Sequence, residues 1–234
     1  MALPYFYIDN FEATQKSIVL DEDTSKHIVQ VLRMKVGEQL NLTDGKGNLL
    51  TAIIEDDHKK HCAVNITEIK FTPASTKKIS VAVSLVKNAS RFEWFLEKAT
   101  EIGIHSIIPL ICERTETEKF RTDRMKGIII SAMLQSQQSW LPELHEPISF
   151  NDFIHFSTCE QKFIAHCLED NKKPLADEIK PTNSRIILIG PEGDFTDDEI
   201  NFAIKNNFVP VTLGETRLRT ETAALVAATI LKFQ

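Results

Sequence analysis

Two glycine-containing segments near the C-terminal end of the chain hold the residues best suited to chemistry. In the first, ILIGPEGDFTDDEI, an apolar stretch runs directly into Gly190 to Gly193. Glycine permits positive φ and proline restricts φ, so we expect the chain to turn sharply here. Thr196 and Glu199 have the spacing of a capping box, which predicts a helix directly after the turn.

This first segment lacks the signatures of the common phosphate-binding loops. It matches neither G-x-G-x-x-G nor G-x-x-x-x-G-K-[ST], which argues against a dinucleotide or nucleoside triphosphate site. Asp197 and Asp198 add negative charge to the first turn of the expected helix, where a phosphate would otherwise bind. A neutral or cationic ligand, such as a sulfonium cofactor, stays compatible with the loop. A purely structural connection between strand and helix would explain the same residues.

The second segment, VTLGETRLRTETAALVAATILKF, places two arginines beside a glycine turn. The guanidinium groups of Arg217 and Arg219 are suited to binding an anionic group. They are equally suited to surface ion pairs with Glu215 or Glu221, and the spacing does not separate these alternatives.

A final helix is predicted from Ala223 to Leu231, with Thr220 or Thr222 as its N-cap. It is apolar on nearly every side, which predicts burial all round. Such a helix lies under a sheet or in a subunit contact, and a homodimer is the favoured interpretation.

The elements that must position these segments alternate between strands and helices. The pattern is typical of a parallel α/β fold, with strands expected at 79–86, 105–111, 162–168 and 185–189 and helices at 92–102 and 124–139. A polar linker is expected from Asn171 to Ser184. In the first of these helices, Glu93, Glu97 and Glu101 follow one another at i,i+4 spacing, so a cationic partner is expected from Lys87, Arg91 or Arg114.

The first seventy residues instead read as short strands separated by turns, which predicts a small barrel. One helix is expected there, from about Ser25 to Met34, capped by Thr24 or Ser25. The polar run FTPASTKK interrupts both periodicities, so we place a domain boundary there, with domains at 1–72 and 73–234.

Charge and composition restrict the class of protein. The formal net charge is -6, which argues against a globally basic nucleic-acid-binding surface. Residues 76 to 126 nevertheless hold ten Lys or Arg against seven Asp or Glu, which fits either a solvated face or an RNA-facing patch. No apolar run is long enough for a membrane span and no secretion signal is recognised, so a cytoplasmic location is expected.

The four cysteines form no Cys-x-x-Cys pair, so neither a zinc ribbon nor a thioredoxin-like site is expected. His155, Cys159, His166 and Cys167 are weak candidates for a metal cluster, because the last two would point to opposite faces of a strand. No metal site is therefore expected.

Taken together, IGPEG followed by F-[ST]-x-x-E, and LG-x3-LR-T-E-T-A near the end, resemble the ribosomal RNA small subunit methyltransferase E family. The similarity extends over nearly the whole chain, through VLRMKVGEQLNLTDGKG at 31–47, Lys87, Glu93-Trp94, KATEIG at 98–103, Pro109, Glu113-Arg114, Gln135-Ser136 and Leu141-Pro142.

The resemblance implies a fold and an activity that spacing alone does not. It implies a SPOUT-type α/β domain with a C-terminal trefoil knot, a small PUA-like RNA-binding barrel at the N-terminus, and a homodimer through the knot domain. The implied reaction transfers methyl from S-adenosylmethionine to N3 of a uridine in 16S rRNA of the small ribosomal subunit, the family target being uridine 1498.

The resemblance also implies roles for particular residues. Arg219 is expected to stabilise the charge that develops on the base. The expected RNA-binding residues are Arg33, Lys35, Lys87, Arg91, Arg114 and Arg124. The expected cofactor-binding residues are His166, Leu168, Ile189, Gly190, Pro191, Glu192, Gly193, Leu213, Gly214, Leu218, Thr222 and Ala223.

The chain departs from the family pattern at two places. Pro4-Tyr5 stands where a basic residue often precedes the first strand, and Gln138 to Trp140 stands where the family often has Arg before Leu-Pro. Both changes remove positive charge and bear on RNA affinity rather than on cofactor binding. Alternatives are a related enzyme that acts on a ribose 2'-hydroxyl or on tRNA, and a non-catalytic RNA-binding or assembly factor.

Overall fold

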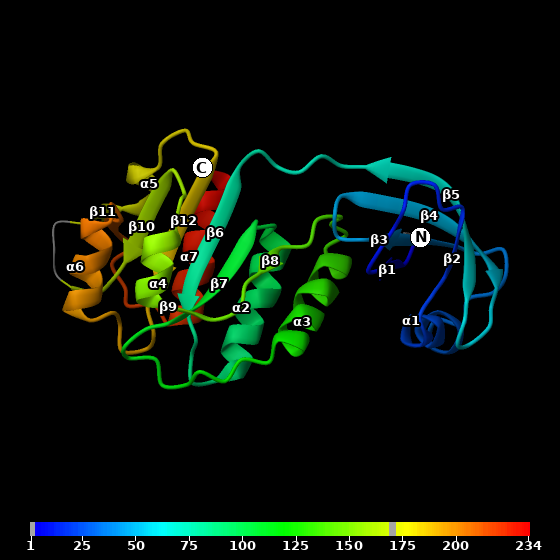
Figure 1. Cartoon of the computed structure of the whole chain (residues 1–234), viewed down its shortest axis with the longest axis horizontal. Helices are drawn as coiled ribbons and strands as arrows, with labels where there is room; N and C mark the ends of the chain where they lie inside the picture. Colours follow the sequence, from blue (N-terminus) through cyan, green and yellow to red (C-terminus); the bar gives the residue numbers. More distant parts are fainter. Residues whose placement is uncertain (1–2, 169–171) are drawn as a thin grey trace. The chain divides into compact units, whose positions relative to one another are not determined.

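The computed structural model describes residues 3–168 and 172–234, so Asn171, where the polar linker was expected to begin, lies outside the described residues. The chain divides into two compact units (Figure 1). One holds Met1–Ala74 together with Met133–Leu141, and the other holds Ser75–Ala132 and Pro142–Gln234.

The first unit is built on a five-stranded curled sheet in the order β1-β3-β4-β5-β2. β1 and β3 are parallel and the remaining neighbours are antiparallel. Its core is apolar, with Ile28, Leu40 and Leu50 fully buried. The strands are β1 Tyr5–Tyr7, β2 Ser17–Val19, β3 Gln39–Thr43, β4 Asn48–Asp56 and β5 Ala63–Phe71.

The helix of this unit begins earlier than expected. It consists of α1 Glu22–Lys26 and the π-helical turn η1 His27–Val31. The predicted cap at Thr24 or Ser25 was wrong, because the carboxylate of Asp21 accepts the Thr24 N–H at 2.9 Å. Ser25 lies inside the helix, where its buried hydroxyl donates to Leu20 O and accepts the Cys62 N–H.

The segment that contains Trp140 packs on the turn between β3 and β4. The Trp140 indole N–H donates to Thr72 O at 2.8 Å, and the Gly47 N–H donates to Ser139 O at 2.8 Å. Gly47 has φ +96°, and a Cβ there would lie 2.6 Å from Thr72 O and 2.8 Å from Trp140 Cζ2. Only glycine satisfies both the dihedral angle and the space at this position.

The second unit is built on a parallel sheet in the order β11-β13-β10-β12-β6-β7-β8, with β9 also paired to β7. An α/β fold with a parallel sheet is thereby confirmed. The strands are β6 Lys78–Ser84, β7 Ser106–Ile111, β8 Glu143–Leu144, β9 Ile148–Ser149, β10 Gln161–Ala165, β11 Lys173–Pro174, β12 Ser184–Ile189 and β13 Val209–Thr212.

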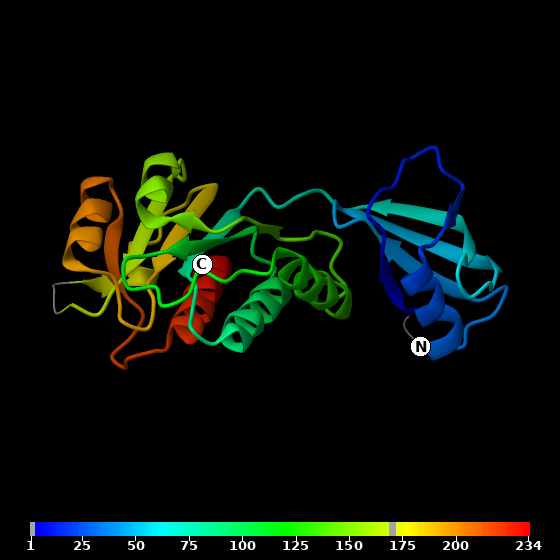
Figure 2. The same ribbon diagram turned by 60° about the horizontal axis from the view of Figure 1, so that its bottom comes forward.

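Helices cover both faces of this sheet. α4 Phe150–Phe156 and α6 Asp197–Lys205 pack on one face, where Phe150, Phe195 and Ile200 join a core cluster with sheet residues. α7 Thr220–Phe233 packs on β6 and β12 and lies beside α2 Ala89–Ile102 on the opposite face (Figure 2). The remaining helices are α3 Thr122–Gln135 and α5 Leu175–Glu178.

The structure changes three expected helix features. α3 ends at Gln135 instead of residue 139, because Gln137 adopts φ +55° and the Gln138 N–H returns to Met133 O. α7 begins at Thr220 after Arg219, and no side chain caps it. Its burial is one-sided rather than complete, because the alanines pack on the sheet while Phe233 is 73% exposed.

Within residues 3–168 and 172–234, no helix combines the length and apolar character needed to cross a lipid bilayer. The same residues contain no group of three or more His, Cys, Asp or Glu side chains arranged to hold a metal ion.

Candidate functional site

A cavity of the second unit lies at the carboxyl ends of three neighbouring strands. β10 pairs with β13 on one side and with β12 on the other, all in parallel, so the loops that follow them meet at one edge. Their loops enclose a cavity of about 610 Å³. Ligands of open parallel sheets bind at this edge, and the two glycine segments identified in the sequence supply two of the three loops.

Most of the expected cofactor-binding residues line this cavity. Those that do are His166, Ile189, Gly190, Pro191, Glu192, Leu213, Gly214, Leu218 and Ala223, together with Arg219. Leu168, Gly193 and Thr222 are not among the lining residues. The prediction omitted further lining residues, most of which lie within or directly beside the three expected loops: Ala165, Cys167, Lys172, Asp194, Val211, Thr212, Glu215, Thr216, Arg217 and Thr220.

The first glycine loop folds tightly against a buried aromatic ring. A Cβ on Gly190 would lie 3.1 Å from both the backbone nitrogen and Cδ2 of Phe195. Phe195 is 2% exposed and its ring lies 5.3 Å from that of Phe150. The loop therefore requires glycine at 190 for space, since its φ is an ordinary one.

The capping box predicted at the start of α6 is confirmed. The Thr196 hydroxyl accepts the Glu199 N–H at 3.3 Å, and Glu199 Oε2 accepts the Thr196 N–H at 2.8 Å. The second oxygen of the buried Glu199 accepts the Glu113 N–H at 2.9 Å, from the loop after β7. One carboxylate thus caps α6 and joins it to the next loop.

Further hydrogen bonds tie the glycine loop to the loops after β6 and β7. Arg114 Nη1 donates to Gly193 O at 2.8 Å and to Phe195 O at 3.3 Å. The Lys87 N–H donates to Glu192 Oε1 at 3.0 Å. These bonds join segments far apart in sequence, so no local motif predicts them.

The arginine loop begins with a glycine turn that needs positive φ. Gly214 has φ +137°, and its carbonyl accepts the Thr212 hydroxyl at 2.9 Å. Arg217 and Arg219 line the cavity, and within residues 3–168 and 172–234 neither forms an ion pair with an acidic side chain. Glu221 instead pairs with Arg91 at 3.7 Å. Among the described residues, the two expected ion pairs with Glu215 or Glu221 are therefore not formed.

Three of the expected RNA-binding residues, Arg33, Lys35 and Lys87, differ in their local contacts. Arg33 follows η1 with φ +57°, and Lys35 Nζ lies 3.3 Å from Asp57. Lys87 lies 2.8 Å from Glu116, and hydrogen bonding to that carboxylate raises the pKa of Lys87.

The acidic stripe on α2 has cationic partners other than those expected. Arg124 donates to both oxygens of Glu93, at 2.5 and 2.8 Å, which lowers the pKa of Glu93. Lys98, on the same helix, pairs with Glu97 and Glu101. The prediction of Lys87, Arg91 or Arg114 was wrong, because Arg124 of α3 and Lys98 of α2 itself form the ion pairs with these glutamates.

Comparison with known proteins identifies relatives over the whole chain. The family described as RNA methyltransferase domain matches residues 73–232, and that described as RNA methyltransferase PUA domain matches residues 20–67. Ribosomal RNA small subunit methyltransferase E of Rickettsia conorii is 30% identical over 224 residues, covering 94% of this chain and 91% of the relative. That of Synechocystis is 29% identical, covering 91% and 72%.

Solved structures share the fold. A probable rRNA-methyltransferase from Porphyromonas gingivalis is 36% identical with a TM-score of 0.89, covering 97% of this chain and 95% of that one. A putative methyltransferase from Legionella pneumophila in complex with the cofactor SAM is 31% identical with a TM-score of 0.90, covering 100% and 98%. Ribosomal RNA small subunit methyltransferase E from Neisseria gonorrhoeae, bound to S-adenosyl methionine, is 28% identical with a TM-score of 0.89, covering 99% and 98%.

Proposed function

Because the chain belongs to the ribosomal RNA small subunit methyltransferase E family, we propose that it methylates N3 of a uridine in 16S rRNA with S-adenosylmethionine as donor. The observation that carries the proposal is the cavity at the ends of β10, β12 and β13, formed by both glycine segments. By analogy with the family, the target is uridine 1498 of the small ribosomal subunit.

The lining of the cavity fits the chemistry of this cofactor. Ile189, Leu213 and Leu218 offer apolar surface for a purine and for the methylene groups beside the sulfur. The acidic side chains of Glu192 and Glu215 suit the positive charge on the sulfur, and the basic lining residues Lys172, Arg217 and Arg219 suit the carboxylate of the cofactor. When bound, the cofactor supplies a methyl group on a positively charged sulfur. Leu168, Gly193 and Thr222 remain part of the proposed cofactor site, as residues that support the three loops without lining the cavity.

Arg219 is the proposed catalytic residue. It lines the cavity and precedes α7, so its backbone position is set by the start of a packed helix. Uridine N3 carries a proton that must leave, and a guanidinium group close to the base would stabilise the negative charge that results. The chain needs no nucleophile of its own, because uridine N3 attacks the methyl carbon directly and the bond from that carbon to sulfur breaks as the new bond forms. Alignment of the base with the methyl group contributes roughly 7–11 kcal/mol in favourable cases.

RNA binding is proposed for the barrel and for the basic residues of the second unit. The candidates remain Arg33, Lys35, Lys87, Arg91, Arg114 and Arg124. Arg114 has a second role in this proposal, because its guanidinium also donates to the glycine loop. Since ion pairs on the protein surface are weak, the pairs of Lys35 and Lys87 with acidic side chains can be exchanged for phosphate contacts.

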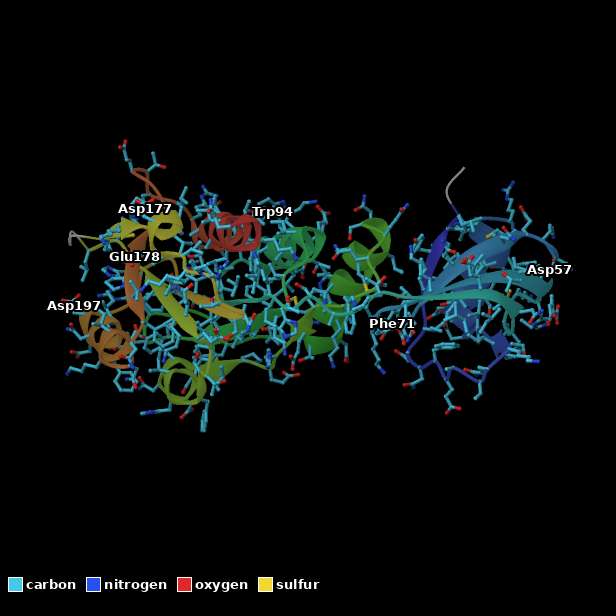
Figure 3. All side chains as sticks on the ribbon, turned by 90° about the horizontal axis from the view of Figure 1, so that it is seen from above. Asp57, Phe71, Trp94, Asp177, Glu178 and Asp197 are labelled. Carbon is cyan, nitrogen blue, oxygen red and sulfur yellow. The ribbon has the colours of Figure 1, made fainter. Side chains whose placement is uncertain are left out.

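A homodimer through the second unit is part of the proposal, as is a trefoil knot at its C-terminal end. Support for the dimer comes from exposed apolar side chains on two neighbouring helices: Phe233 of α7 is 73% exposed, and Trp94 of α2, labelled in Figure 3, is 42% exposed. Light scattering of the purified chain should then give twice the monomer mass. A cytoplasmic location is proposed because the substrate is ribosomal RNA.

The deciding experiment is methyl transfer from labelled S-adenosylmethionine to small ribosomal subunits that lack the modification. Mass spectrometry of the product nucleosides should identify N3-methyluridine. Detection of a ribose-methylated nucleoside would contradict N3 of uridine as the target atom. Absence of transfer to any RNA despite cofactor binding would contradict the proposed activity.

A further inference from the structure

Asp194 occupies an unusual position in the first glycine loop. Its backbone has φ +63°, a left-handed conformation that glycine adopts freely and that Asp and Asn adopt more readily than other residues. Its N–H donates to Pro191 O at 2.9 Å, which closes the turn. A glycine would satisfy these backbone demands equally well, so the contribution specific to aspartate lies in the carboxylate.

That carboxylate joins two loops. Asp194 Oδ2 accepts the Cys167 N–H at 2.7 Å, and Oδ1 accepts the Phe195 N–H at 2.9 Å. Cys167 belongs to the loop after β10 and lies 27 residues away in sequence. A hydrogen bond from an amide to a carboxylate is stronger than one between neutral groups. Asp194 therefore connects the loop after β12 to the loop after β10.

Both connected loops line the cavity, and Asp194 itself lines it. Arg114, from the loop after β7, also donates to Gly193 O and Phe195 O, so side chains and backbone groups of two other loops hold the turn. Burial raises the pKa of the Cys167 thiol, and the nearby negative charge of Asp194 raises it further.

We infer that Asp194 is a positioning residue whose carboxylate fixes the distance between the loops after β10 and β12, and thereby the width of the cofactor cavity. The inference rests on the proposed function, since the cavity is taken to bind S-adenosylmethionine. It concerns cofactor affinity rather than the methyl transfer step, because Asp194 acts through the Cys167 backbone.

The test uses Asp194→Gly, which keeps the backbone conformation and removes the carboxylate. The melting temperature should stay within about 3 °C of the native value. The dissociation constant of S-adenosylhomocysteine, measured by calorimetry, should rise about tenfold, equivalent to about 1.4 kcal/mol. KM for S-adenosylmethionine should rise in parallel while kcat changes less than about twofold, as expected when only ground-state binding is lost.

Two further variants separate positioning from general effects of charge. Asp194→Asn should restore part of the affinity, because the amide oxygen still accepts the Cys167 N–H. Asp197→Asn makes the same change of charge at the exposed outer end of α6 (Figure 3) and should bind S-adenosylhomocysteine as the native protein does. Hydrogen exchange of the Cys167 amide, without ligand, should be faster in Asp194→Gly than in Asp197→Asn.

The outcomes distinguish the two proposals. If the native chain fails to bind S-adenosylhomocysteine, the proposed function is overturned and the inference with it. If the native chain and Asp194→Gly bind equally well, or if exchange of the Cys167 amide is unchanged, the inference alone is overturned.

Discussion

Substitution of Gly190 by alanine should destabilise the second unit through a steric conflict that the structure defines. The added Cβ would lie 3.1 Å from the Phe195 backbone nitrogen and 3.1 and 3.2 Å from two carbons of its ring. Relief of these contacts requires Phe195 to move, but its ring is buried against Phe150. No backbone strain contributes, because Gly190 lacks a positive φ.

The expected magnitude follows from overpacking. An extra carbon in a well-packed core costs about 1–3 kcal/mol. For a chain of this length, each kcal/mol shifts the melting temperature by roughly 2–4 °C, so Gly190→Ala should melt roughly 2–12 °C below the native protein. The displaced loop should also bind S-adenosylhomocysteine more weakly, which calorimetry would measure.

Gly127→Ala provides the matched control. Gly127 lies within α3, and a Cβ there would meet no heavy atom within 4 Å apart from the chain neighbours and the backbone of its own helix. Alanine is favoured over glycine in a helix by about 0.8–1 kcal/mol, so this variant should melt above the native protein. Equal melting temperatures for Gly190→Ala and the native chain would refute the steric argument. Lower melting temperatures for both variants would show that the difference in free space around the two glycines does not predict their effects.

The remaining predictions concern the site and the barrel. Arg219→Ala should lower kcat more than about tenfold through lost charge stabilisation, with unchanged affinity for S-adenosylhomocysteine by calorimetry; native turnover would remove Arg219 from the mechanism. Gly193→Val should weaken S-adenosylhomocysteine binding in the same assay, because its Cβ would lie 3.3 Å from Arg114 Cδ and displace that side chain. Unchanged binding would show that cofactor binding does not require the contact with Arg114. Gly47→Ala should destabilise the first unit by more than about 1 kcal/mol, since Thr72 O would lie 2.6 Å from the added Cβ. Thermal unfolding followed by tryptophan fluorescence should show a lower transition temperature than that of the native protein. An unchanged transition temperature would contradict the predicted steric conflict.

Features set by neighbours along the chain could be predicted from the sequence. The capping box of Thr196 and Glu199 is an example, because both its hydrogen bonds join residues three positions apart. The apolar run that forms β12 and the sharp turn after it are likewise local properties. The order of strands and helices after Lys78 followed from the same kind of pattern, and it indicated the parallel α/β architecture that the structure has.

Contacts between distant segments were decided by the tertiary structure. The bond from the Cys167 amide to Asp194 exists because β10 and β12 are paired in parallel, which brings their following loops together. Arg124 reaches Glu93 because its helix packs near α2, whereas the sequence offered closer basic residues. Hydrogen bonds and ion pairs depend on distance in space, and only the folded chain brings together groups that lie tens of residues apart.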